Sequence, residues 1–265
     1  MGARLTQQAD PNAAVIRKAV ANLLSTNAVS SDPLALRAVL IAGGKGYDSG
    51  TPLEAALGSL KQPEQWPKDK RIGLAAALAA AERYGKAPAA DLEAAAKLLT
   101  ADQQTDGSYG SALDSWLARA ALISSGMQPD NFTIVQIDKW SRSLTVENLT
   151  DATTALLVLE MASDVMADNL RRTSLLIIRQ AQRPNGGFAA SEGAPGVYDT
   201  ALAVVALAVL DVEPRLARST YRPEELKEAI ANGKAFLVSQ QRADGSWPEG
   251  IAANAWALTA LVSGS

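Results

Sequence analysis

Apolar runs separated by short polar stretches occupy most of this 265-residue chain. Alanine and leucine dominate the runs, β-branched alternation is scarce, and Pro and Gly fall between the runs. The pattern therefore predicts helices rather than strands. Division at the breaks gives about twelve helices. They cover residues 12–26, 33–42, 52–61, 71–84, 89–104, 112–125, 133–143, 151–163, 167–183, 198–210, 223–241 and 252–263.

One phrase, Gln-x-x-[Asp/Asn]-Gly-x-aromatic, recurs at residues 103–109, 182–188 and 241–247. Each copy follows one apolar run and precedes another, which is typical of repeat proteins built from helical hairpins. A shortened form runs from Gln62 to Pro67, and the first and fourth predicted hairpins lack the phrase. The twelve helices therefore pair into six hairpins, which we expect to form a single domain over residues 1–265.

The phrase has a structural interpretation. Asp-Gly or Asn-Gly is expected to end the first helix of the hairpin, because glycine tolerates the left-handed conformation that closes a helix. The aromatic residue is expected to fold back as an apolar plug. The glutamine is expected to satisfy free backbone groups at a neighbouring helix end.

The second helices of the hairpins are apolar on nearly all sides. Their apolar runs begin at Asp114, Asp151, Asp199 and Asn254. A helix of this kind is buried on most sides and belongs to an inner layer. The first helices carry more charge and suit an outer layer. Two concentric layers built from repeated hairpins predict an all-α fold, a closed α/α toroid of six hairpins.

Composition restricts the chemistry. The chain contains no cysteine and no histidine, so the usual zinc ligands and the commonest general base are missing. We expect no zinc and no other cofactor, with a hard divalent cation on oxygen ligands left open. The net charge of −3 argues against nucleic acid as a partner. No apolar run reaches the roughly 20 residues of a membrane span, so we expect a cytoplasmic protein or one exported after removal of a signal peptide.

The Gln-x-x-Asp-Gly-x-Trp phrase, followed by a Thr-Ala-Leu type of helix, resembles the repeats of the terpenoid cyclase and protein prenyltransferase superfamily. It is similar to the repeats of squalene-hopene cyclases and prenyltransferase β subunits. The resemblance covers roughly residues 50–265 and is sharpest in 98–126, 174–210 and 235–263. It implies a toroid of six hairpins, a fold that serves several unrelated functions.

The catalytic motifs of these relatives are absent. Zinc-dependent prenyl transfer needs an Asp/Cys/His ligand set, and the chain has neither Cys nor His. The Asp-x-Asp-Asp acid of polyene cyclases and the Asp-Asp-x-x-Asp of prenyl diphosphate ionisation are missing too, because no Asp-Asp pair occurs. We therefore expect a binding or scaffold module whose central cavity or rim holds an apolar or peptide-like partner. The alternative is a divergent terpenoid-cyclase-like enzyme that acts on an isoprenoid with an Asp general acid.

The resemblance implies that functional residues lie where inner helices begin, at Asp114, Asp151 and Asp199, with Asn254 close to the same register. These carboxylates are candidates to bind a cation, or one of them to act as an acid with a raised pKa. The alternative interpretation is that each is an ordinary helix N-cap.

Four further residues lie on or beside these helices. Trp116, Tyr198 and Trp256 are candidate ligand contacts, with a place in the core as the alternative. Arg119 is a candidate anion clamp in the cavity, or else its stem covers apolar surface while the guanidinium reaches solvent.

Overall fold

The computed structural model describes residues 10–47, 57–83, 89–160, 164–190, 193–212 and 220–264. Within these ranges the chain is helical and contains no strand, only two isolated bridges. The all-α prediction is thereby confirmed. In the same ranges no helix is long and apolar enough to cross a membrane. Most of the predicted helix 52–61 lies outside the described residues.

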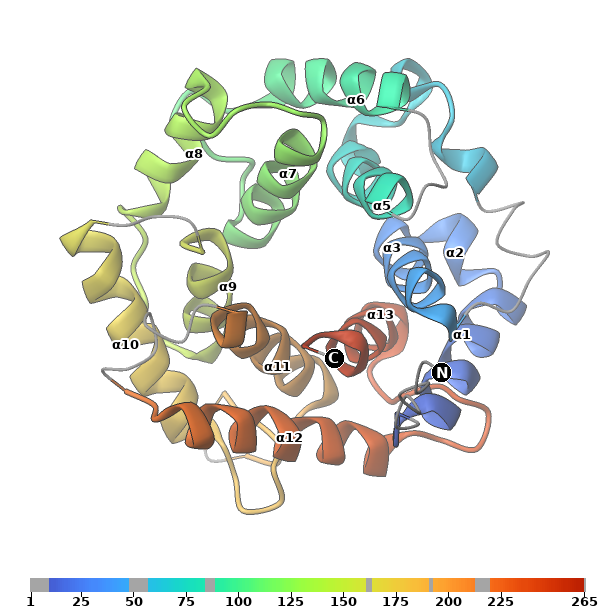
Figure 1. Cartoon of the computed structure of the whole chain (residues 1–265), viewed down its shortest axis with the longest axis vertical. Helices are drawn as coiled ribbons and strands as arrows, with labels where there is room; N and C mark the ends of the chain where they lie inside the picture. Colours follow the sequence, from blue (N-terminus) through green and yellow to red (C-terminus); the bar gives the residue numbers. More distant parts are fainter. Residues whose placement is uncertain are drawn as a thin grey trace, which may run out of the picture.

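The longer helices of the described residues form an inner and an outer group (Figure 1). The inner helices are α3 (Pro33–Ala42), α5 (Arg71–Arg83), α7 (Ala112–Ser124), α9 (Leu149–Val158), α11 (Val197–Val212) and α13 (Gly250–Val262). The outer helices are α1 (Ala13–Ser25), α6 (Ala89–Asp102), α8 (Phe132–Ser141), α10 (Val165–Ala181) and α12 (Pro223–Gln240). The short elements are α2 (Ala28–Ser31), η1 (Gly43–Tyr47), η2 (Gly58–Leu60), η3 (Pro63–Gln65) and η4 (Lys68–Lys70).

The boundaries mostly lie close to the predicted ones, and α3 begins and ends at the predicted residues. The clearest difference is at α9, which ends at Val158 instead of near residue 163. Leu159 adopts a turn there, and its carbonyl accepts a hydrogen bond from the Arg171 guanidinium of α10 at 3.0 Å. The end of α9 therefore depends on a residue of the next hairpin.

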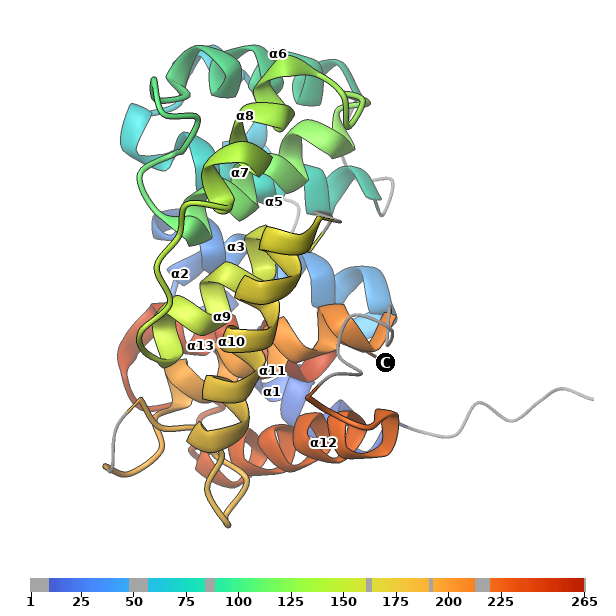
Figure 2. The ribbon, with the colours of Figure 1, turned by 90° about the vertical axis from the view of Figure 1, so that its left-hand side faces the viewer.

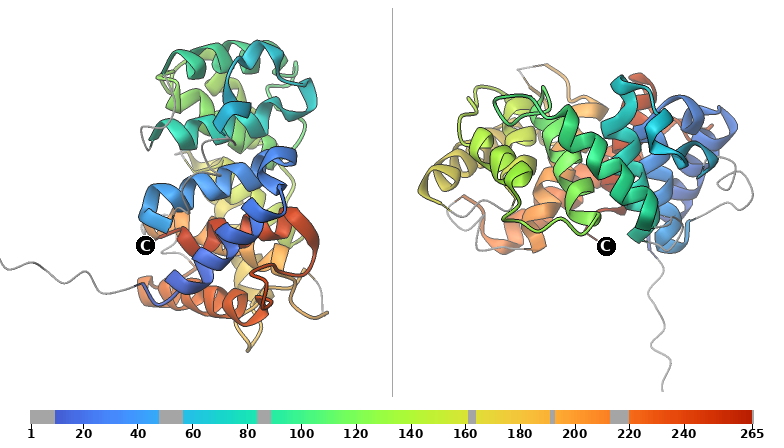
Figure 3. Two further views of the ribbon diagram at one scale, coloured as in Figure 1. Left: turned by 90° about the vertical axis from the view of Figure 1, so that its right-hand side faces the viewer. Right: turned by 90° about the horizontal axis from the view of Figure 1, so that it is seen from above.

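The inner helices pack in a circuit. Each packs against the next in the order α3, α5, α7, α9, α11, α13, and α13 packs against α3 (Figure 1). The side views place α8 and α10 over α7 and α9, and α1 beside α13 (Figures 2 and 3). The first and last hairpins of the described chain are therefore neighbours.

In the hairpins for which the structure describes both helices, the more apolar helix is also the more buried one. Every residue of α13 from Ala253 to Val262 is buried, and so is every residue of α5 from Leu74 to Ala81. The outer helix α10 instead buries one face, with Ala167, Arg171, Ser174, Leu175, Ile178 and Ala181 inside. This spacing is that of an amphipathic surface helix.

The glutamine of each phrase joins its hairpin to the next outer helix. Gln103 donates through Nε2 to the Gly107 carbonyl in its own turn and to the Thr133 carbonyl in α8, both at 2.9 Å. The other copies make equivalent pairs of bonds, from Gln182 to Gly186 and to Ala229 of α12, and from Gln241 to Gly245 and to Val15 of α1. The glutamine reaches a neighbouring helix, as predicted. Thr133 and Val15 lie in the first turn of that helix, whereas Ala229 lies in the interior of α12.

The glycine of each phrase packs against that same helix. Gly107, Gly186 and Gly245 have φ of 93°, 86° and 88°, so the predicted left-handed conformation is confirmed. The prediction that these glycines end the first helix was wrong, because α6, α10 and α12 end five residues earlier. A Cβ at any of them would lie closer than 3.0 Å to a backbone carbonyl oxygen of the next outer helix, that of Gln136, Asn232 and Lys18 respectively. We call the two glutamine bonds together with this glycine contact the amide clamp.

The aromatic residues of the phrase are plugs, as predicted. Tyr109, Phe188 and Trp247 are 6%, 0% and 2% exposed. Their backbone N–H groups donate to polar side chains in the first turn of the following inner helix, namely Ser115, Thr200 and Asn254. Each plug therefore fixes the start of an inner helix.

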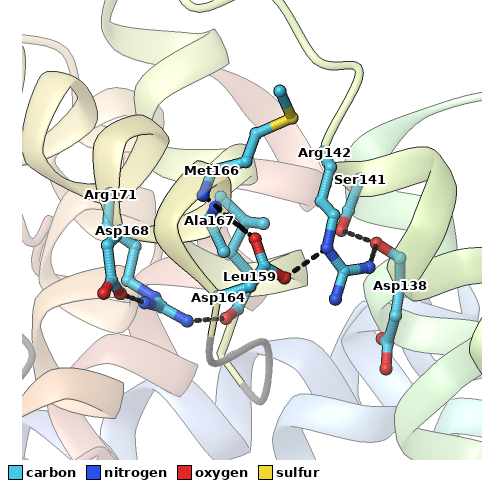
Figure 4. A network of polar contacts seen from close by, with 9 residues as sticks. All are labelled: Asp138, Ser141, Arg142, Leu159, Asp164, Met166, Ala167, Asp168 and Arg171. Atoms are coloured by element: carbon cyan, nitrogen blue, oxygen red, sulfur yellow. Dashed lines mark hydrogen bonds and ion pairs between the residues drawn. The ribbon is translucent and has the colours of Figure 1, made fainter.

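The fourth hairpin, which lacks the phrase, is joined to the fifth by charges (Figure 4). Arg142 is the C-cap residue of α8, the position that Gln182 and Gln241 occupy on α10 and α12. Its guanidinium pairs with Asp164, the N-cap residue of α10, and donates to the Asp138 carbonyl. We call the Arg142–Asp164 pair the ionic junction.

Candidate functional site

The first turns of the inner helices lie on one face, which we call the N-terminal rim. One groove is lined by Pro33, Gly73 and Leu113, at the starts of α3, α5 and α7. A second is lined by Leu113, Asp151 and Tyr198, at the starts of α7, α9 and α11. The start of α13 joins the same face, because Glu249, which directly precedes it, binds the first turn of α11.

The second of these grooves, which we call the rim pocket, has a volume of about 440 Å³. Its walls combine apolar side chains, two aromatic rings, hydroxyl groups and one carboxylate. The residues that define it are Leu113, Trp140, Leu144, Asp151, Thr154 and Tyr198. Apolar walls with a few polar groups are the usual composition of small-ligand sites, and the carboxylate favours a ligand with a positive charge.

Asp114 and Asp151 are not the N-cap residues of their helices, so that interpretation was wrong by three positions. The caps are Ser111 and Asn148, whose side-chain oxygens accept the backbone N–H of Asp114 and Asp151 at 3.0 Å. The Asp114 carboxylate in turn accepts from the Ser111 hydroxyl at 2.8 Å. The carboxylates therefore lie in the first helical turn, where a negative charge is favourable near the positive end of the helix dipole.

Asp199 also lies within the first turn of its helix. The backbone N–H groups that begin α11, those of Val197 and Tyr198, donate to the Glu249 carboxylate at 2.8 and 3.0 Å. Burial, and then the nearby charge of Glu249, raise the pKa of Asp199 above its usual value. Asp199 is therefore the rim carboxyl that holds a proton to higher pH than an ordinary aspartate.

Tyr198 lies near two of the predicted carboxylates. Burial raises the pKa of its hydroxyl first, followed by the charges of Asp199 and Asp114. Its ring lines the rim pocket together with Asp151. The structure therefore brings Tyr198, Asp114, Asp151 and Asp199 to the same rim.

Asn254 is displaced from the predicted register by one position. Its side chain accepts the Trp247 backbone N–H at 2.7 Å, the role that Ser115 and Thr200 play in the other hairpins. Those residues directly follow Asp114 and Asp199, so Asn254 belongs with the plug contacts and not with the carboxylates.

Trp116 and Trp256 meet in the interior. Their ring centroids are 6.2 Å apart, although α7 and α13 are not neighbours in the circuit of inner helices. Trp116 donates from Nε1 to the Glu160 carboxylate at 3.4 Å, and the Arg37 guanidinium lies 5.2 Å from the centre of its ring. Indole rings therefore occupy the middle of the helical circuit at this level.

Arg119 occupies neither of the predicted places. It is 5% exposed and pairs with Asp138 of α8 at 2.8 Å. Both the anion clamp in a cavity and the solvent-exposed guanidinium are thus replaced by a buried ion pair between an inner and an outer helix. Breaking a pair of this kind would leave an uncompensated charge, so the residue is structural.

Comparison with known protein families and with curated proteins finds no match to this sequence. The functional assignment therefore depends on the site itself.

Two residues of the rim were not predicted. Trp140 ends up in the rim pocket from the last turn of α8, and Glu249 reaches α11 from the start of α13. Glu249 belongs to a different hairpin from the α11 groups that it binds, and Trp140 shares the pocket with residues of the two neighbouring hairpins, so no local pattern indicates either. Within the described residues no three acidic side chains gather closely enough to hold a metal ion.

Proposed function

We propose that the chain forms a closed α/α toroid of six helical hairpins and belongs to the terpenoid cyclase and protein prenyltransferase superfamily. The circuit of packing from α3 through α13 back to α3 supports a closed arrangement. The amide clamp from Gln241 to Val15 supports it at the point where the first and last hairpins meet. The repeated phrase supports the family, since each copy makes the same set of contacts.

Within this architecture the function that the site favours is binding of a peptide-like partner on the N-terminal rim. The rim pocket carries this proposal, because Trp140, Tyr198 and Asp151 line one groove of about 440 Å³ at the junction of three inner helices. The interior is a poorer candidate, since the Trp116–Trp256 contact crosses the helical circuit there. The proposed activity requires no metal or cofactor.

The chemistry of the rim pocket favours a partner with a basic group beside an apolar one. Asp151 is the charged group among the described residues that line the pocket, and Leu113, Leu144 and Trp140 supply apolar surface. Asp114 and Asp199 lie close to Tyr198, so they add negative charge nearby. A lysine or arginine side chain with a neighbouring leucine meets both requirements, through its charge and through its apolar stem.

The test is a titration of the protein with the capped peptide Leu-Lys-Leu-Lys, followed by the indole N–H signal of Trp140 in NMR spectra. We expect saturable binding, and roughly tenfold weaker affinity for Asp151→Asn, because one charge-assisted contact is lost. Tyr198→Ala should weaken binding as well. The matched control is Asp130→Asn, which makes the same charge change at an exposed position just before the N-terminus of α8, at the end opposite to Trp140.

Two outcomes count against the binding proposal. One is equal affinity for the peptide Leu-Glu-Leu-Glu, and the other is an equal loss of affinity in Asp130→Asn and Asp151→Asn. Either would show that the rim carboxylate does not select the partner.

One observation favours the second candidate, an enzyme with an Asp acid. Asp199 is half-buried and its pKa is raised by burial and by Glu249, and carboxyl groups with a shifted pKa are often found at functional sites. A raised pKa also makes a weaker acid, which suits protonation of an oxygen better than of a carbon–carbon double bond. Incubation with farnesol, an isoprenoid whose hydroxyl oxygen can accept a proton, and mass spectrometry of the extract tests this candidate. Products from the native chain that disappear in Asp199→Asn would favour it over the binding module.

A further inference from the structure

A separate groove of about 560 Å³ lies between α2, the start of α3 and the turns that precede α5. It shares no lining residue with the rim pocket. Its apolar walls include Val29, Pro33, Trp66 and Leu74. The volume lies within the range of small-molecule sites in proteins.

The charged residues that line this groove are both lysines. Lys61 and Lys70 contribute to its walls, and no carboxylate does among the described residues. Neither lysine forms an ion pair in the described part of the chain. Lys70 donates through Nζ to the Ser31 carbonyl at 3.1 Å, so its side chain connects η4 with α2. On a chain with a net charge of −3, this groove is a local concentration of positive charge.

The nearby acidic groups do not neutralise the two lysines. The Asp32 carboxylate accepts the backbone N–H groups of Leu34 and Ala35 at the start of α3. Asp32 and Asp69 line the adjoining groove of the N-terminal rim, which shares Lys70 with this one, and among the described residues neither carboxylate forms an ion pair with Lys61 or Lys70. The groove therefore has the charge that attracts an anion.

Trp66 adds an unsatisfied donor. It is 6% exposed, lines the groove, and its Nε1 has no hydrogen-bond acceptor. The corresponding aromatic residues of the full phrases differ in this respect, because Trp247 Nε1 donates to the Leu237 carbonyl and the Tyr109 hydroxyl donates to that of Leu99. Buried polar groups in proteins are nearly always paired, so the unpaired indole N–H of Trp66 distinguishes the shortened phrase from the full copies at 103–109 and 241–247.

We propose that this groove binds an amphipathic organic anion, with its phosphate or carboxylate on Lys61 and Lys70 and its apolar body against Pro33, Trp66 and Leu74. Ammonium groups are hydrogen-bond donors without acceptor capacity, so the two lysines select a ligand rich in acceptors. The apolar walls exclude a bare inorganic anion as the preferred ligand, because it would leave them in contact with water.

The test is a titration with phenyl phosphate and, in parallel, with phenylacetate, monitored by the indole N–H signal of Trp66. We expect saturable binding of at least one of these probes, and the stronger of the two identifies the head group. Inorganic phosphate and benzyl alcohol, which supply the head and the body alone, should each bind at least tenfold more weakly. In the double variant Lys61→Gln, Lys70→Gln, affinity should fall roughly tenfold for each charge-assisted contact removed.

Lys68→Gln is the matched control, since Lys68 lies in the same segment, is highly exposed and does not line the groove. Its affinity should change by less than twofold. An equal loss in Lys68→Gln and in the double variant would overturn the proposal by showing unspecific attraction. Equal binding of benzyl alcohol would overturn it as well, and so would the absence of saturable binding to either anion. A thermal melt of each variant separates loss of binding from loss of folding.

Discussion

Neighbouring outer helices are connected by different chemistry at two junctions. One junction lies between α12 and α1, and the other lies between α8 and α10. In both, the residue at the C-cap of an outer helix reaches the next outer helix. At the first junction Gln241 donates two neutral hydrogen bonds, and Gly245 lies against the α1 backbone. At the second, Arg142 forms an ion pair with Asp164. The comparison shows that the position of the connecting side chain is retained while its chemistry is replaceable.

The two chemistries should differ in strength and in their response to solvent. The amide clamp includes close packing of backbone on backbone, which tolerates no added atom. The ionic junction joins side chains that are 32% and 41% exposed, where water and salt weaken the attraction. Substitutions that act on one junction at a time test this distinction.

The largest expected effect is that of Gly245→Ala. Its left-handed backbone costs alanine about 1–2 kcal/mol, and displacement of the neighbouring Lys18 carbonyl costs about 1–3 kcal/mol more. We expect the free energy of unfolding in urea to fall by about 3 kcal/mol in all. Gly250→Ala is the control, because Gly250 has the same φ of 88° but open space around it. Equal losses in the two variants would show that the packing against α1 contributes nothing.

Gln241→Ala should have the next largest effect. It removes two neutral hydrogen bonds, each contributing about 0.5–1.5 kcal/mol, so unfolding in urea should require about 1–3 kcal/mol less. Gln240→Ala serves for comparison, since that side chain is exposed and bonds only to its neighbour Ser239. A loss below that of Gln240→Ala would mean that the clamp depends on the glycine alone.

Arg142→Gln should cost less, at most about 1 kcal/mol at low ionic strength. Because the pair is partly exposed, the difference between native chain and variant should shrink in roughly 1 M NaCl, where the screening length is about 3 Å. Urea unfolding at low and high salt measures this, with Arg172→Gln as the control at an exposed position of α10. If the difference persists at high salt, the hydrogen bond from Arg142 to the Asp138 carbonyl holds the junction instead of the ion pair.

The smallest expected effect concerns acid. The backbone N–H of Ser108 lowers the pKa of Asp106, and the Ser246 hydroxyl, followed by its N–H, lowers that of Asp244. A carboxyl with a lower pKa in the folded state adds stability above its unfolded pKa, and this stability is lost as the pH falls through the folded value. The loss should therefore occur below about pH 4.

The second copy of the phrase shows how to remove this acid sensitivity. It has Asn185, whose side-chain oxygen accepts the Gly187 N–H at 3.2 Å and does not titrate. The double variant Asp106→Asn, Asp244→Asn should therefore lose less stability than the native chain between about pH 5 and pH 2. Urea unfolding across this pH range measures the difference. Equal losses of stability in the native chain and the double variant would show that these turns are not the source of the acid sensitivity.

The sequence predicts those features that depend on neighbouring residues. Helix ranges, the left-handed glycines and the buried aromatic residues follow from local periodicity and backbone preference. The acceptors of the glutamines do not, because Val15 and Gln241 are 226 positions apart and nothing in either segment indicates the other. Arg142 was missed for a related reason, since the fourth hairpin keeps the position but not the phrase.

In the candidate site, too, the features that follow from local pattern were predicted and those that depend on a distant partner were not. The gathering of Asp114, Asp151 and Asp199 on one face follows from their equivalent positions in repeated helices. The place of Arg119 was predicted wrongly because its partner, Asp138, belongs to the neighbouring outer helix. A charged residue in an apolar run is ambiguous until the opposing helix is known.

The contact between Gln241 and Val15 has a consequence for synthesis of the protein. While a ribosome adds the residues between them at about 5–20 per second, α1 and α3 wait on the order of ten seconds to a minute for their partners. Their apolar faces are open to chaperones and to other nascent chains during this interval. Completion of the last hairpin ends that exposure, so translation speed through the preceding segments should influence the yield of native protein.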